Sequence, residues 1–113
     1  MNRGSLHWRK EADMVRGTTP TLTFTLPFPV STLSALYINI SQHYESIQIE
    51  KNLSDCTTSG NDVSVVLTQD DTLKLVAGKQ AFIQVRVRTS DGTALASEMI
   101  PCMVEDVLKD GVI

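Results

Sequence analysis

The stretch that decides the fold runs from Lys79 to Pro101 and reads KQAFIQVRVRTSDGTALASEMIP. Successive side chains of a β-strand point to opposite faces, so a period of two marks a strand with one buried and one solvated face. Ser90-Asp91-Gly92 then supplies the positive φ angles of a tight turn. The stretch is therefore predicted to be a β-hairpin. Its buried positions are Ala81, Ile83, Val85 and Val87, and its solvated positions are Phe82, Gln84, Arg86 and Arg88.

The same alternation predicts four more strands, at residues 21–26, 36–41, 47–53 and 63–67. The loop between the second and third of these is short, so we expect them to be neighbours in a hairpin. Their aliphatic positions and those of the first hairpin are predicted to form one core. The predicted core consists of Leu22, Phe24, Leu36, Ile38, Ile40, Ile47, Ile49, Val65, Leu67, Ile83, Val85 and Val87.

A change of period after Leu67 predicts one helical turn near residues 69–75. Thr68 can accept a hydrogen bond from the backbone at Asp71, while the Asp71 carboxylate reaches back to Thr68, as in a capping box. Leu75 is then expected to close one end of the core, together with Leu73.

The remaining segments leave alternatives open. The return strand of the hairpin, Thr93 to Val104, contains Pro101, which predicts a sheet edge or a bulge because proline cannot donate to a ladder. Residues 54–56 are a candidate for a short separate strand, and Ser59-Gly60-Asn61 is a turn signal. The tail, residues 105–113, is either a last edge strand or a loose end.

Length and composition define the class of protein. A chain of 113 residues is one domain, and 42% hydrophobic with 20% charged residues is ordinary for a globular protein. Short strands separated by turns predict an all-β fold, an antiparallel immunoglobulin-like sandwich of six to seven strands. Residues 14–113 form this single domain.

Charge argues against some partners. Residues 1–16 hold four basic and two acidic residues, so the rest of the chain holds six basic and eleven acidic ones and is acidic overall. Affinity for a phosphate backbone comes from Lys and Arg, and a membrane-spanning helix needs about 20 apolar residues in a row. We therefore expect no nucleic-acid and no membrane partner, and synthesis and folding in a cytoplasm.

Residues 1–13 lack strand patterning. Lys10-Glu11-Ala12 can be encoded by a message containing AAGGAGG, a bacterial ribosome-binding sequence, and Met14 follows closely. The favoured interpretation is a translated leader that is not native to the fold, with Met14 as the biological start. The alternative is a flexible arm that packs Leu6 and Trp8 on the body.

The chain offers little that predicts catalysis or metal binding. Cys56 and Cys102 are expected to be buried thiols without a disulfide, and their spacing to the two histidines matches no zinc site. His43 is expected to be an exposed loop residue. Two acidic pairs, at residues 70–71 and 105–106, could in principle bind calcium. Calcium is disfavoured, because adjacent side chains of a strand point apart and the first pair fits the start of the helical turn better. No catalytic residue, no metal and no cofactor is predicted.

The most site-like surface is the solvated face of the first hairpin strand, where Phe82, Gln84, Arg86 and Arg88 form a small basic and aromatic stripe. Arginine and aromatic residues are enriched where proteins contact one another. These four residues are the candidate interaction face, and a plain solvated sheet face is the alternative.

Three segments carry a resemblance to a known family: residues 14–24 (MVRGTTPTLTF), 67–73 (LTQDDTL) and 84–88 (QVRVR). They resemble small proteins of Firmicutes phages and prophages that are similar to the N-terminal β-sandwich domain of siphophage baseplate upper proteins. The resemblance implies a structural or docking role in a phage tail tip, association with the virion, and no catalytic residues.

The predicted function is therefore a non-catalytic interaction module of a tail-tip (baseplate) assembly. Its partners would be other tail proteins, or a second copy bound through an edge strand such as the one with Pro101. The alternative is a stand-alone carbohydrate- or ligand-binding sandwich, in which exposed rings such as Tyr37 and Tyr44 would stack on a sugar. An enzyme is the least favoured class.

Overall fold

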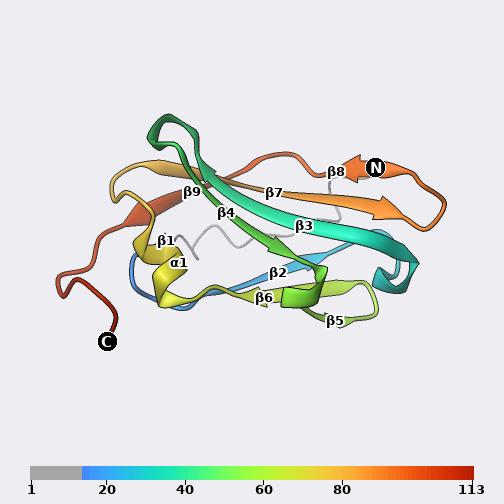
Figure 1. Ribbon diagram of the computed structural model, residues 1–113, viewed down its shortest axis with the longest axis horizontal. Coiled ribbons are helices and arrows are strands. Elements are labelled where there is room, and N and C mark those ends of the chain that lie inside the picture. The colour runs from blue at the N-terminus through green and yellow to red at the C-terminus, as the bar shows by residue number, and fades with distance from the viewer. Residues whose placement is uncertain (1–13) are drawn as a thin grey trace.

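The computed structural model describes residues 14–113, and the predictions for residues 1–13 lie outside this range (Figure 1). This part of the chain forms nine strands, one short α-helix and three 3₁₀ turns. The strands are β1 (Met14–Val15), β2 (Thr21–Thr25), β3 (Leu33–Gln42), β4 (Ile47–Asn52), β5 (Thr57–Ser59), β6 (Asp62–Val66), β7 (Gln80–Thr89), β8 (Ala94–Ala96) and β9 (Ile100–Glu105). The helix is α1 (Gln69–Leu73), and the 3₁₀ turns are η3 (Val30–Thr32), η4 (His43–Glu45) and η5 (Leu53–Asp55).

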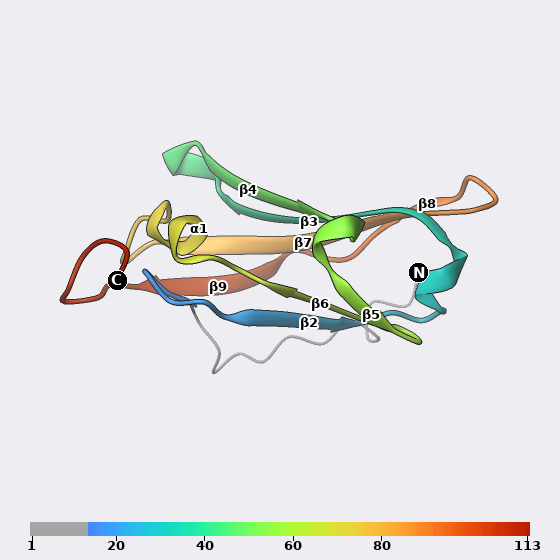
Figure 2. The same ribbon diagram turned by 60° about the horizontal axis from the view of Figure 1, so that its bottom comes forward.

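The strands form two sheets, which confirms the predicted all-β class. The large sheet has the order β1-β9-β7-β3-β4, with β8 beside β7, and the small sheet has the order β2-β6-β5. Figure 2 shows the two sheets as two layers, with α1 near the C-terminal end of β9. The described strands outnumber the predicted six or seven, because β1 and β5 lack an alternating pattern long enough to detect. One pair is not antiparallel as predicted: β1 runs parallel to β9.

The core lies between the two sheets and contains the predicted residues. Eleven of the twelve predicted core residues are buried, and the twelfth, Ile47, is half-buried and packs against the cluster. Met14, Leu26, Leu75 and Cys102 also belong to this core. Period-two alternation therefore gives the correct phase for every long strand, because the inward face of each is the aliphatic one.

The predicted capping box at α1 is confirmed. The Thr68 Oγ1 accepts from the Asp71 N–H at 3.0 Å, and the Asp71 Oδ2 accepts from the Thr68 N–H at 2.9 Å. The Asp71 carboxylate also pairs with Lys51 Nζ in β4 at 2.8 Å, with only 10% of its side chain exposed. A charge on the edge strand of the large sheet thus holds the helical turn against the end of the core.

The prediction of one continuous return strand from Thr93 to Val104 is wrong. β8 and β9 both lie along β7, but residues 97–99 leave the ladder between them. At this break the buried Ser97 keeps the contact, because its N–H donates to the Val85 C=O at 2.9 Å and its hydroxyl accepts from the Val85 N–H at 3.0 Å. Pro101 then pairs opposite Phe82 in β9, and β1 pairs only with Val104 and Glu105, so within residues 14–113 no strand lies on the other side of Pro101, as the edge alternative predicts.

The proposed strand at residues 54–56 is also wrong. Asn52 and Asp55 form a second capping box, in which Asn52 Oδ1 accepts from the Ser54 N–H and Asp55 Oδ2 accepts from the Asn52 N–H, so the chain turns into η5 instead. The Asp-Asn chemistry favours a turn over a ladder here. The tail after Glu105 forms no strand, but it is not a loose end either, because the Ile113 N–H donates to Gln69 Oε1 at 2.9 Å and Arg16 pairs with Asp106 and Asp110.

Two polar side chains organise the end of the fold near α1. Gln42 at the end of β3 is buried, and its amide accepts from the Val76 N–H at 2.7 Å and donates to the Val76 C=O at 2.9 Å. Arg16 donates to the carbonyls of Leu73 and Leu75 and to the Asp106 carboxylate. Segments that are far apart in the sequence are thereby tied together.

Candidate functional site

The structure places all four residues of the candidate interaction face on the outward side of β7. Arg86 and Arg88 are exposed, Phe82 is 37% exposed and Gln84 is half-buried. β7 lies in the interior of the large sheet, between β3 on one side and β8 and β9 on the other. A strand paired along both edges is a stiff support for side chains, so the face is presented on a rigid part of the fold.

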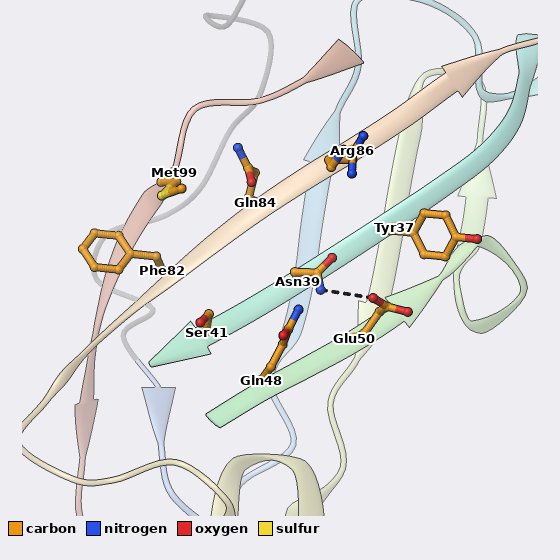
Figure 3. Close-up of a pocket in the computed structure, with 9 residues that line it drawn as sticks. All are labelled: Tyr37, Asn39, Ser41, Gln48, Glu50, Phe82, Gln84, Arg86 and Met99. Atoms are coloured by element: carbon orange, nitrogen blue, oxygen red, sulfur yellow. Dashed lines mark hydrogen bonds between the residues drawn. The ribbon is translucent and has the colours of Figure 1, made fainter. Parts of the chain in front are cut away.

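Neighbouring strands add to this surface in register with β7. On β3, Ser41 lies opposite Phe82, Asn39 opposite Gln84 and Tyr37 opposite Arg86. β4 continues two of these rows with Gln48 and Glu50. The rows enclose an open depression of about 540 Å³ (Figure 3). It is lined by Tyr37, Asn39, Ser41, Gln48, Glu50, Phe82, Gln84, Arg86 and Met99. We call this surface the outer-face depression.

The outer-face depression combines apolar and basic groups. Phe82 and Met99 lie at one end and Tyr37 lies at the other, and all three are substantially exposed, at 37%, 63% and 43%. Arg86 lies beside Tyr37 at the second end, and its guanidinium makes no hydrogen bond or ion pair with any residue of the range 14–113. Tyr37 and Arg86 also line a second depression of about 330 Å³, which extends the surface towards Arg88.

Several other polar groups of this surface are held by partners on the protein. Asn39 Nδ2 donates to Glu50 Oε1 at 3.2 Å, and Gln84 Nε2 donates to the Ser97 C=O at 2.9 Å. Arg88 Nε donates to Ser34 Oγ at 3.1 Å. Such bonds fix side-chain orientation in advance, which lowers the entropic cost of binding. Arg86 is the cation on this surface that keeps its donors for a ligand.

Sequence reasoning found the β7 side of the surface and missed the rest. Tyr37, Asn39 and Ser41 alternate outwards in β3 by the same rule that exposed the β7 residues, so their outward direction could be read from the sequence. Their position beside β7 could not, because the chain between Ser41 and Phe82 gives no pairing signal. Met99 was placed on a continuous strand, and its actual position follows from the break at Ser97.

The two tyrosines weighed for sugar stacking do not share one site. Tyr37 lines the outer-face depression, whereas Tyr44 lies in η4 at the hairpin tip and lines a separate depression of about 370 Å³. Phe82 lines both. A ligand that spans the two rings would therefore have to cross Phe82. The side chain of His43, beside Tyr44, lies outside the described part of the molecule.

The cysteines and acidic residues considered as metal ligands have structural roles. Both cysteines are free thiols: Cys102 is buried in the core, while Cys56 is only half-buried, and this partial burial raises the pKa of its thiol. Asp71 serves the capping box. Asp106 accepts from the Val107 N–H and from Arg16, and these bonds lower the pKa of its carboxyl. Among residues 14–113, no group of three or more His, Cys, Asp or Glu side chains is arranged to hold a metal ion.

Comparisons with known proteins leave the chain without a family. No family model, no curated protein and no solved structure matches it. Within the described residues, no helix has the length and apolar character needed to cross a membrane. A function for this chain is therefore inferred from the geometry of the outer-face depression.

Proposed function

We propose that this protein is a non-catalytic interaction module of immunoglobulin-like sandwich type, which binds another protein through the outer-face depression. The observation that carries the proposal is Arg86, a cation without a described partner, which lies beside the exposed ring of Tyr37 on a rigid strand that also carries Phe82. Arg, Tyr, Phe and Met are the residues enriched at protein interfaces.

The chemistry of the depression suggests the chemistry of the partner. Arg86 and Arg88 stand on a domain that is acidic overall, and the guanidinium fork matches a carboxylate in two-point contact. Tyr37 provides a ring next to this charge, and Phe82 and Met99 provide an apolar contact at the other end of the depression. The partner surface would therefore carry an acidic side chain flanked by an apolar one. The resemblance to baseplate upper proteins makes the tail-tip proteins of a phage the first partners to test.

The test is binding to tail-tip proteins produced together with the chain and measured after purification. Reversing Arg86 to Glu should weaken the complex by at least about tenfold, since a like charge would face the partner's carboxylate. The matched control is Lys109→Glu, the same charge change on an exposed residue of the tail. Equal affinity of the Arg86→Glu and Lys109→Glu variants would contradict the use of this surface.

A carbohydrate-binding function is the second candidate, and a specific observation favours it. Asn39, Gln48, Glu50 and Gln84 line the floor between Tyr37 and Phe82, and amides and carboxylates are the groups that bond sugar hydroxyls. On this candidate, Tyr37→Ala and Asn39→Ala should abolish binding to a glycan, while Arg86→Glu should have little effect. Glycan binding without affinity for any tail protein would replace the first proposal by the second.

A further inference from the structure

The edges of the two sheets are protected unequally. Natural sheets block edge pairing with inward-pointing charges, with proline and with very short edge strands. In the large sheet, the edge strand β4 carries Lys51, whose side chain turns inward to Asp71 and is 19% exposed. The opposite edge strand, β1, is only two residues long, and it lies beside β9, which carries Pro101. In the small sheet, the edge strand β5 is only three residues long. Each of these edges therefore has one of the known protective features.

Strand β2 has none of them. It is the other edge of the small sheet, and within residues 14–113 it pairs with β6 alone. Its five residues read TLTFT, with no charge and no proline. Leu22 and Phe24 point into the core, while the three threonines lie on the outward face, where they are exposed or half-exposed.

The register shows which backbone groups of β2 have no partner strand among residues 14–113. The Leu67 N–H donates to the Pro20 C=O, and the Leu26 N–H donates to the Asn61 C=O, so these residues mark hydrogen-bonded positions at both ends of the strand. Hydrogen-bonded and non-bonded positions alternate along an antiparallel pair, which turns Leu22 and Phe24 towards β6. The N–H and C=O groups of Thr21, Thr23 and Thr25 therefore point away from the sheet.

We infer that β2 is a self-association edge, and that its occupant is the β2 strand of a second copy of this chain. An antiparallel pairing centred on Thr23 places Thr23 opposite its own copy and Thr21 opposite Thr25. These are the residues whose backbone groups point outwards, so each outward N–H of one copy faces a C=O of the other copy. The paired outward side chains are all threonines, which combine favourably across strands and bring no like charges together.

This pairing joins two small sheets into one continuous sheet of six strands, with the order β5-β6-β2-β2-β6-β5. It differs from the edge predicted from sequence, because the strand with Pro101, β9, is flanked by β7 and, at Val104 and Glu105, by β1. The interface also lies away from the outer-face depression, since β2 belongs to the small sheet and the depression to the large one (Figure 2). A failure of one proposal therefore leaves the other intact.

Sedimentation equilibrium of the full chain tests the inference. A contact of one five-residue edge is smaller than a standard interface, so we expect a dissociation constant of about 0.1–1 mM. Thr23→Lys places two ammonium groups opposite each other and should weaken the dimer by at least about tenfold. The matched control is Thr57→Lys, because Thr23 and Thr57 flank Ser64 in one row at opposite edges of the same sheet. This control should leave the dimer unchanged.

Two further measurements distinguish the occupant. A mixture of Thr23→Lys and Thr23→Glu chains should form a heterodimer, because opposite charges then meet at the centre. In the unmodified chain, hydrogen exchange at the Thr23 amide should slow as protein concentration rises. A monomer throughout the concentration range, a dimer insensitive to Thr23→Lys, or no heterodimer in the mixture would overturn the inference. Protection of the Thr23 amide that does not depend on concentration would also overturn it, since the edge would then be paired within one chain.

Discussion

Replacing Asp71 by Asn isolates the charge that joins β4 to α1. The asparagine keeps an oxygen that can accept from the Thr68 N–H, but it no longer pairs with Lys51 Nζ, which lies 2.8 Å from the carboxylate. Both side chains are mostly buried, at 10% and 19% exposed. A hydrogen bond to a charged group contributes about 1.5–3 kcal/mol, so the free energy of unfolding at pH 7 should fall by about this amount.

The matched control is the neighbouring Asp70, which is exposed and makes no described side-chain bond. Asp70→Asn should change the free energy of unfolding by less than about 0.5 kcal/mol. Urea unfolding measures both variants, and an unchanged slope with denaturant would show that the unfolded state is the same. In a double-mutant cycle with Lys51→Met, we expect a coupling of at least about 1 kcal/mol.

The pH dependence follows from the pKa of Asp71. Burial works to raise this pKa, but the hydrogen bonds from Lys51 and Thr68 outweigh burial and hold it below the ordinary value of 3.8. A carboxyl with a lowered folded-state pKa stabilises the fold fully above the unfolded pKa, and it loses this effect as the pH falls through the folded pKa. The difference between the parent and Asp71→Asn should therefore be constant near neutral pH and shrink below pH 3.8. A difference that is absent at pH 7, or equally large in strong acid, would refute this reasoning.

Three other changes test the fold by urea unfolding. Ile83→Ala removes a fully buried side chain from the core and should cost about 2–4 kcal/mol, and a loss below half a kcal/mol would show that the strand had been phased wrongly. Gln42→Leu leaves the N–H and C=O of Val76 without their partner, and should cost about 2–4 kcal/mol, whereas a neutral effect would mean that water replaces the amide. Ser97→Ala should cost about 1–3 kcal/mol and speed exchange at the Val85 amide, and an unchanged exchange rate would contradict the role of the hydroxyl.

Local features of the fold could be predicted from sequence. The capping box of Thr68 and Asp71 depends on residues three positions apart, and the phase of a long strand such as β7 depends on residues two positions apart. Both features can therefore be predicted from a few neighbouring residues. Gln42 carried a readable signal as well, since it continues the inward series of Ile38 and Ile40 as a polar residue. A buried polar group at a strand end indicates that a backbone segment needs its hydrogen bonds.

Long-range partners could not be predicted. The bond between Lys51 and Asp71 joins an edge strand to a helical turn, and the sequence of neither segment indicates that the two are in contact. The break at Ser97 was missed because a serine hydroxyl can replace a backbone partner without disturbing the hydrophobic pattern around it. The candidate site was half found for the same reason: outward direction is a local property, whereas the pairing of β3 with β7 is not.

The parallel pairing of β1 with β9 determines how the fold would respond to force. Met14 pairs with Val104, Val15 pairs with Glu105, and the Arg16 N–H donates to the Glu105 C=O at 2.9 Å. Tension applied at Met14 and Ile113 would draw these two strands in opposite directions along their common axis. The bonds between them would then be loaded together, in shear, and would have to break at once. A hairpin pulled open from its free ends breaks its bonds one after another, so this fold should be mechanically strongest along the line that joins Met14 to Ile113.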